Sequence, residues 1–166
     1  MRFRIEQRLA APVERVEAAL LDPDWYRAVT DSPAVWAPEL LDVADDGGSR
    51  VDLRVRYRFR GTLNPAAAKV VSADKLSMVH VSALDRVSHV IDLRIEPDHY
   101  ADRLRFGGGS VVLQPEGDVT LRVLDGDLKV KVPLVAGKVE GAVVSGLRQH
   151  AAVEERVFAA FVASTR

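Results

Sequence analysis

The longest stretch of regular hydrophobic spacing lies at the end of the chain, from Pro133 to about Ala163. If each residue turns by about 100°, one stripe of mostly apolar positions forms and charged residues occupy the opposite face. Pro133 stands where a helix tolerates proline, in its first turn. The pattern therefore predicts a long amphipathic helix. Its apolar stripe holds Val139, Val143, Gly146, His150, Val153, Val157 and Phe161.

Two features of this stripe differ from an ordinary helix core. Gly137, Gly141 and Gly146 each cost about 1 kcal/mol relative to alanine in a helix interior, so we expect another segment to approach closely there. His150 lies near the middle of the apolar stripe. A helix with one apolar face needs a surface to pack on, and the upstream sequence predicts a sheet that supplies it.

The first thirty residues predict one strand and two short helices. Residues 2–9 alternate between apolar and charged side chains, which is typical of a half-buried strand. A helix then runs from Pro12 to about Asp22, and Asp22 followed by Pro23 gives the start signal of a second helix. The side of the first helix that faces water is expected to hold Glu14, Arg15 and Glu17, and the second helix should carry Trp25, Tyr26 and Val29.

From residue 35 the apolar period changes to two, which predicts six further strands. Pro38 indicates an edge strand or a bulge, and the glycines at 107–109 indicate a bend. The segment 61–75 breaks the pattern and predicts a crossover with one short helix. The break at 125–127 is compatible with a hairpin tip, although one bulged strand is favoured. The predicted strands are 35–45, 50–60, 76–84, 87–96, 102–115 and 119–132.

The hairpin formed by 76–84 and 87–96 is expected to turn at Asp85 and Arg86. A two-residue turn fixes the register of the two strands. One face is then mostly apolar and points inward. It holds Met78, His80, Ser82, Leu84, Val87, His89, Ile91, Leu93 and Ile95.

This order of elements resembles the START-like superfamily, also called SRPBCC or Bet v 1-like. The resemblance is carried by Ala11–Val16 after the first strand, by the paired short helices and by the passage Val130–Val135. It implies an α+β helix-grip fold (β-α-α-β6-α) over a single domain, 1–166, in which a curved seven-stranded antiparallel sheet wraps around a long C-terminal helix. Within the superfamily, the chain looks most similar to a bacterial family of unknown function.

The resemblance also implies a cavity, because members generally hold lipids, sterols, hormones or polyketides between sheet and helix. A minority are cyclases, dehydratases or hydrolases. The physical argument is independent: a bent sheet cannot touch a straight helix along its whole length, and glycines on the helix leave volume unfilled. The alternative is a plain core in which the glycines only allow closer docking.

Inward-facing histidines are the main candidates for chemistry, since the chain has four in all. His80, His89 and His150 are expected to border one space, where an imidazole can donate, accept or transfer a proton. Each can also be an ordinary hydrogen-bonded core residue. No metal and no cofactor are expected, because no carboxylate stands at a ligand spacing from them. With the aromatic candidates, the predicted ligand-binding residues are His150, Tyr57, Phe59, His80, His89, Val143, Gly146, Tyr100 and Trp36.

Composition excludes several classes of function. The absence of cysteine excludes disulfides and thiol catalysis, and no apolar run reaches the roughly 20 residues that a membrane helix requires. The net charge of −1 argues against nucleic acid as a partner. The arginines at 54, 56, 58 and 60 are interpreted as a solvated, salt-bridged outer face. The expectation is a cytoplasmic protein without stable membrane insertion, whose oligomeric state the sequence does not specify.

Three functions follow from these observations. The first is non-catalytic binding of a largely apolar small molecule, such as a lipid, sterol or polyketide, with His150 and Tyr57 as polar anchors. The second is a polyketide cyclase or dehydratase that uses an inward histidine as general acid or base. The third is a protein-interaction module with a filled core.

Overall fold

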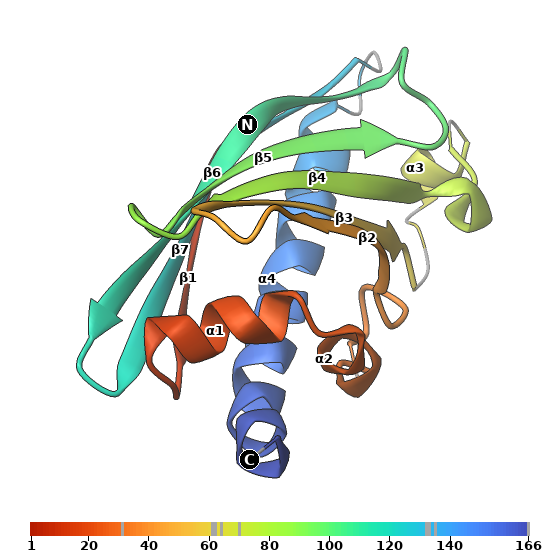
Figure 1. The fold of residues 1–166 in the computed structure, drawn as a ribbon. Helices are drawn as coiled ribbons and strands as arrows, with labels where there is room; N and C mark the ends of the chain where they lie inside the picture. Colours follow the sequence, from red (N-terminus) through yellow and green to blue (C-terminus); the bar gives the residue numbers. More distant parts are fainter. Residues whose placement is uncertain are drawn as a thin grey trace.

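The computed structural model describes residues 1–30, 32–60, 63, 65–69, 71–131, 134 and 136–165. Seven antiparallel strands form one sheet in the order β1-β7-β6-β5-β4-β3-β2, and the sheet curves around the long helix α4 (Figure 1). The strands are β1 (Arg2–Leu9), β2 (Glu39–Asp45), β3 (Arg50–Arg58), β4 (Ser77–Asp85), β5 (Val90–Pro97), β6 (Leu104–Glu116) and β7 (Val119–Val130). The helices are α1 (Val13–Leu20), α2 (Pro23–Ala28), α3 (Pro65–Ala68), a 3₁₀ turn (Ala73–Lys75) and α4 (Ala136–Ser164). This is the predicted helix-grip fold; the expected helix start at Pro133 lies outside the described residues.

Helices α1 and α2 cover one end of the sheet and hold the end of α4. Asp22 caps α2 as predicted, because its carboxylate accepts the Asp24 N–H at 2.8 Å. The Trp25 ring meets Phe158 and Phe161 of α4 at centroid distances of 5.1 and 5.4 Å. These aromatic contacts fix the C-terminal half of α4 against the rest of the molecule.

The β4–β5 hairpin differs from the prediction in its turn. Asp85 pairs with Val90, so four residues, 86–89, form the connection instead of two. The register moves by four positions, and an even shift keeps the remaining inward residues on the same face. Val87 and His89 are the exceptions, since both now lie in the turn, and His89 adopts φ 56°.

Strand β7 is continuous through residues 125–127, so the hairpin alternative is wrong. It pairs with β1 in one register from Arg2–Asp127 to Leu9–Thr120. The register shift falls instead between Phe106 and Gly109 of β6, where the glycine bend was predicted. Because β7 itself has no bulge, its even-numbered residues share one face of the sheet, and Arg122 is one of them.

The buried face of α4 is broader than the predicted stripe. Val144, Glu154 and Phe158 are buried in addition to His150, whereas Val143 and Val157 are only half-buried. The expected close approach to glycine occurs at Gly146, where an added Cβ would lie 3.4 Å from Ala34 Cβ. At Gly137 and Gly141 no atom of the described residues beyond the helix itself lies within 4 Å of an added Cβ, so the expected close approach is not found there.

Two apolar clusters fill the space between sheet and helix. The larger one joins α1, α2 and the C-terminal half of α4, and includes Val16, Leu84 and Phe158. The smaller one joins the start of α4 to β6 and β7, and includes Leu128 and Val139. No helix among the described residues is long and apolar enough to cross a membrane.

We expect Gly109→Ala to lower the free energy of unfolding by about 1–3 kcal/mol, because its Cβ would stand 2.8 Å from the backbone oxygen of Asp125. Gly141→Ala is the matched control, and it should raise stability by up to about 1 kcal/mol because the site is open. Urea unfolding of both variants measures the two changes. Equal effects would contradict the close strand contact at Gly109.

Candidate functional site

A group of polar side chains lies inside the fold, between the sheet and α4. Gln7 of β1 donates from Nε2 to the Ala151 carbonyl at 2.8 Å and to Glu154 Oε2 at 3.0 Å. Arg122 of β7 donates from Nη1 to the same Glu154 oxygen at 3.0 Å. These bonds tie the edge of the sheet to the middle of α4. Gln7 and Glu154 are buried, and Arg122 is largely so.

Three predicted site residues meet beside this ion pair. The rings of Tyr57 on β3 and His80 on β4 lie 4.2 Å apart between centroids, and His150 of α4 meets Tyr57 edge-on at 5.7 Å. His150 Nε2 is also 3.5 Å from Glu154 Oε1, one helical turn along α4. Strands β3 and β4 thus place a phenol and an imidazole against the helix, as the alternation of each strand predicted.

The imidazole nitrogens of this group are short of hydrogen bonds. His80 Nε2 and both ring nitrogens of His150 are enclosed and have no hydrogen-bond partner among the described residues. The 3.5 Å approach of His150 to Glu154 is an ion-pair distance without the alignment of a hydrogen bond. A buried polar atom without a partner costs about 1–3 kcal/mol, so this arrangement requires an explanation.

Burial and the ion pair set the charges of the site. Burial lowers the pKa of His80 to about 3, and the nearby Arg122 charge acts in the same direction. Burial alone would raise the pKa of Glu154, but Arg122 and the neighbouring donors outweigh it and lower the pKa to about 2. Burial raises the pKa of Tyr57 well above its ordinary value. At neutral pH the site therefore holds a neutral His80, a neutral Tyr57 and an ionised Glu154.

His80 borders a small cavity on the inner face of the sheet. Its volume is about 20 Å³, which is room for one water molecule. The ligand-sized cavity expected from the sequence is not present here, because side chains from both apolar faces close on the gap between helix and sheet. A larger guest needs these side chains to move. The lining residues are Phe3, His80, Leu93, Ile95, Phe106, Gly108, Gly109, Leu124, Gly126, Asp127 and Leu147.

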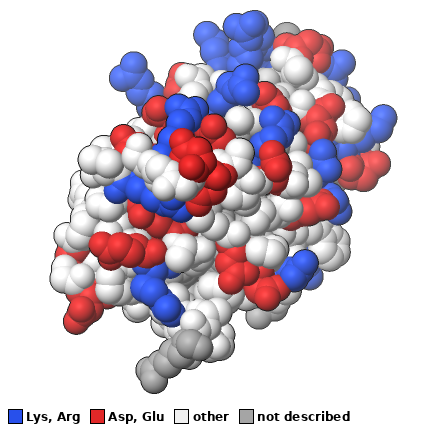
Figure 2. Space-filling model, in the orientation of Figure 1, with Lys and Arg blue, Asp and Glu red and all other residues white. Residues whose placement is uncertain are grey.

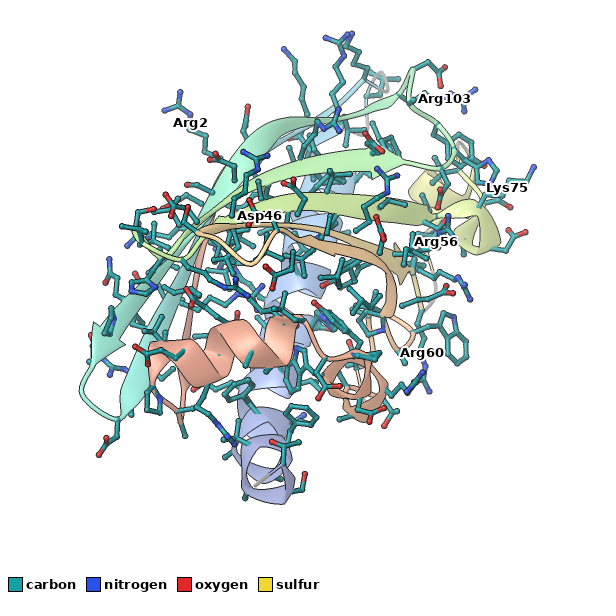
Figure 3. All side chains as sticks on the ribbon, viewed as in Figure 1. Arg2, Asp46, Arg56, Arg60, Lys75 and Arg103 are labelled. Carbon is teal, nitrogen blue, oxygen red and sulfur yellow. The ribbon has the colours of Figure 1, made fainter. Side chains whose placement is uncertain are left out.

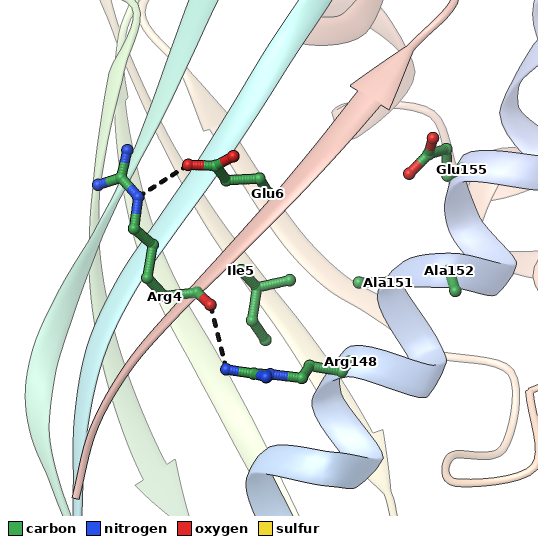
Figure 4. A pocket seen from close by; sticks show the side chains of 7 residues that line it. All are labelled: Arg4, Ile5, Glu6, Arg148, Ala151, Ala152 and Glu155. Carbon is green, nitrogen blue, oxygen red and sulfur yellow. Dashed lines mark hydrogen bonds and ion pairs between the residues drawn. The ribbon is translucent and has the colours of Figure 1, made fainter.

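A larger hollow, of about 260 Å³, lies between β1 and the outer side of α4 (Figure 4). Arg148 crosses it and donates to the Arg4 carbonyl at 3.4 Å, while Arg4 pairs with Glu6 at 2.9 Å. Arg4 and Glu6 thus neutralise each other, and the Arg148 guanidinium is held by a backbone oxygen. We therefore place the candidate site at the inner polar group and not here.

The other predicted site residues lie away from His80 and His150. His89 bonds through Nδ1 to Glu17 of α1 at 2.8 Å, so Glu17 is buried and not solvated as expected. Tyr100 accepts the Ser72 N–H at 3.0 Å, and Trp36 is 54% exposed with Arg60 4.6 Å over its ring. Three residues are half-buried: Phe59, which bridges Val35 next to β3, and Val143 and Gly146 on α4.

The arginines at 54, 56 and 58 on β3 form ion pairs on the outer face, as predicted, whereas Arg60 lies beyond β3 and over the Trp36 ring. Arg54 pairs with Glu96 at 3.3 Å and Arg58 with Glu39 at 2.7 Å. Arg56 lies 3.5 Å from Asp98, and Figure 3 shows Arg56 and Arg60 on the outside of the molecule. Within the described ranges, no three His, Asp, Glu or Cys side chains gather closely enough to hold a metal ion.

Sequence reasoning missed Gln7, Arg122 and Glu154. Two of them carried a usable signal: Gln7 continues the inward alternation of Phe3 and Ile5, and Glu154 stands four residues after His150 on the same helix face. Arg122 was missed, because the apolar residues beside it, Val119, Leu121 and Val123, are odd-numbered and drew the attention to the other face.

The neutral His80 makes the fold sensitive to acid. The pKa of His80 falls from 6.5 to about 3 on folding. Below pH 6.5 a proton binds His80 in the unfolded state but not in the folded state, so the free energy of unfolding decreases as the pH falls from 6.5 toward 3. At about pH 5 the loss is about 2 kcal/mol. His80→Leu should remove this loss in urea unfolding at about pH 7.5 and about pH 5. The control His99→Leu, in an exposed turn, should keep it; parallel losses in all three proteins would contradict the neutral imidazole.

Solved structures share this fold over nearly the whole chain at low sequence identity. The Thermus thermophilus protein TTHA0849 is 22% identical, with a TM-score of 0.63 over 96% of this chain and 99% of that one. Zhui aromatase/cyclase from Streptomyces sp. R1128 is 17% identical, with a TM-score of 0.62 over 98% and 93%. Norcoclaurine synthase from Thalictrum flavum, in complex with dopamine and hydroxybenzaldehyde, is 16% identical, with a TM-score of 0.58 over 100% and 88%. At these identities the likeness shows the fold alone, and it agrees with the expected helix-grip architecture.

A search among curated protein sequences finds no match to the chain. A family model does match, over residues 4–162, and its description is "Protein of unknown function (DUF2505)". The match spans β1 to the last turns of α4, and so includes every residue of the inner polar group. The chain therefore belongs to the DUF2505 family.

Proposed function

We propose that the protein binds a small organic molecule between the sheet and α4, where His80, His150 and Tyr57 meet. The observation that carries this proposal is the set of enclosed imidazole nitrogens without hydrogen-bond partners. A guest that offers a donor or an acceptor there satisfies them. Binding then recovers free energy that folding alone does not.

The two histidines lower the stability of the fold, because their buried nitrogens lack hydrogen bonds. An apolar side chain of similar size at position 80 or 150 would pack without an unsatisfied nitrogen, and such replacements are neutral or stabilising. Positions that lower stability in this way are typical of functional sites. Gln7, Arg122 and Glu154 bond to one another nearby. Among the described residues of this group, Arg122 Nε also lacks a partner, so the shortage falls on three imidazole nitrogens and one guanidinium nitrogen.

The surroundings define the kind of guest. The cavity beside His80 is lined mostly by apolar side chains, among them Phe3, Ile95 and Phe106, so the body of the guest is apolar. Its polar end is a neutral group such as a hydroxyl or carbonyl, because the Arg122–Glu154 pair already balances its own charge. The Thalictrum flavum structure, which has the same fold, holds two small aromatic molecules with polar groups, dopamine and hydroxybenzaldehyde.

A catalytic role for the same residues is the second candidate. His150 stands 3.5 Å from the Glu154 carboxylate, and such an imidazole–carboxylate pair suits general acid–base catalysis on a bound substrate. Turnover of an identified guest that is lost in His150→Ala, while binding of the guest is retained, would favour the enzyme over the carrier.

Titration with the neutral fluorescent probe N-phenyl-1-naphthylamine tests the binding proposal. We expect saturable binding to the native protein and an affinity about fivefold lower in His80→Leu and in His150→Leu, since each removes about 1 kcal/mol of hydrogen bonding. His99→Leu, which changes an exposed turn, should bind as the wild type does.

Urea unfolding of the same variants separates binding from folding. The two inward variants should be as stable as the wild type or more stable at neutral pH, because each loses an unsatisfied buried group. Absence of saturable binding, or equal affinity in all the variants, would overturn the proposal. A large loss of stability in the inward variants would show instead that the imidazoles serve the fold.

A further inference from the structure

A group of cations lies on the outer face of the sheet, where β6 begins and β7 ends. Arg105 and Lys129 are direct cross-strand partners, and the Lys131 N–H donates to the Arg103 carbonyl at 2.7 Å, so the next pair along is also basic. Arg2 begins the neighbouring strand β1. Figure 2 shows Lys and Arg side chains gathered along the upper rim of the molecule, and Figure 3 labels Arg2 and Arg103 on the two sides of that rim. We call Arg2, Arg105, Lys129 and Lys131 the basic patch.

The basic patch differs from the rest of the outer face because its cations form no recorded ion pairs, although Asp127 stands opposite Arg2 in the β1–β7 register. Elsewhere on the sheet, arginines pair with carboxylates at 2.7–3.5 Å. In the part of the chain that the structure describes, no ion pair is recorded for Arg2, Arg105, Lys129 or Lys131. The adjacent Asp127 lies 3.4 Å from the N-terminal amino group of Met1. The net charge of −1 therefore conceals a local excess of positive charge.

This arrangement has an electrostatic cost within the protein alone. Like charges directly opposite each other on a sheet are destabilising, and Arg105 faces Lys129 in that position. An external anion relieves the repulsion. Because the four cations are spread over three neighbouring strands, they suit an extended anionic surface better than a single small anion.

An apolar side chain accompanies the basic patch. Leu134 follows Lys131 by three residues, just before α4, and it is 103% exposed with φ 67°. A fully exposed leucine gains nothing from a nucleic-acid backbone, whereas at a bilayer it can enter the apolar layer below the headgroups. We propose that this end of the molecule docks peripherally on an anionic lipid bilayer, with the basic patch on the phosphates and Leu134 below them.

The proposal goes beyond ligand binding and is independent of it. The basic patch lies on the outside of the sheet, and it shares no residue with the group of His80, His150 and Tyr57. Vesicle binding tests the docking and probe binding tests the ligand site, so either one can fail while the other persists. The predicted absence of stable membrane insertion is compatible with docking of this kind, since a few cations and one leucine give only reversible association.

Vesicle co-sedimentation tests the docking. The protein should partition onto phosphatidylcholine vesicles with about 30% phosphatidylglycerol, should not partition onto pure phosphatidylcholine, and should lose binding as salt rises. The triple variant Arg105→Gln/Lys129→Gln/Lys131→Gln should partition about a hundredfold more weakly, because each basic residue contributes about fivefold. The matched control Lys69→Gln/Lys75→Gln/Arg156→Gln removes the same charge from other exposed positions and should partition like the wild type.

Two further measurements make the outcome specific. Leu134→Ser should weaken partition about fivefold without lowering the thermal midpoint. The triple basic variant should be as stable as the wild type or more stable, since it relieves repulsion. Absence of partition at low salt, or equal partition of the triple variant and its control, overturns the proposal. Tight binding to DNA without vesicle binding assigns the patch to nucleic acid and overturns it as well.

Discussion

The contact of Arg122 with Glu154 is the interaction on which the interior depends. It joins β7 to α4 at 3.0 Å, and Gln7 of β1 adds a bond to the same carboxylate oxygen. Removing one partner of a buried ion pair leaves an unpaired charge and costs about 3–5 kcal/mol. The pair therefore fixes the rotation of the helix against the sheet. That rotation is what brings His150 to the same place as His80 and Tyr57.

The two parts of this polar interior differ in their hydrogen bonding. Gln7, Arg122 and Glu154 bond to one another, and such bonds rigidify a fold. The imidazole nitrogens beside them have no hydrogen-bond partner among the described residues, and the cavity that His80 borders has room for only one water molecule. A purely structural polar network would include them. Their exclusion from it is the physical basis of the proposal that a guest binds here, and the small cavity means that such a guest would have to displace apolar side chains on entry.

The fold follows from the sequence because alternation and helical periodicity are local signals. They predicted the strands, the paired helices, α4 and the glycine bend of β6. The errors concern register, which depends on how many residues each turn or bulge consumes. A two-residue turn was assumed where four residues connect β4 to β5, so His89 was assigned to the interior. A bulge was favoured in β7, but β7 keeps one register with β1, and the register shift lies only at the predicted glycine bend of β6. The volume between helix and sheet depends on side-chain packing, which no spacing rule gives.

The interior and the outer surface of this molecule differ in their charge balance. Inside, Arg122 and Glu154 neutralise each other, whereas on the outer face the basic patch carries an excess of positive charge. A balanced interior rejects ions, because a charged guest would lose its hydration without gaining a counter-charge. An unbalanced outer rim attracts anions over a distance of about one Debye length, and this attraction weakens as salt rises. The two properties are separable, since Arg105 and Lys129 point away from the interior that Arg122 and Glu154 hold together. A guest delivered from an anionic surface would meet first the rim beside Leu134 and then the apolar cluster at the start of α4. The cations that would bind an anionic surface thus take no part in recognising a neutral guest.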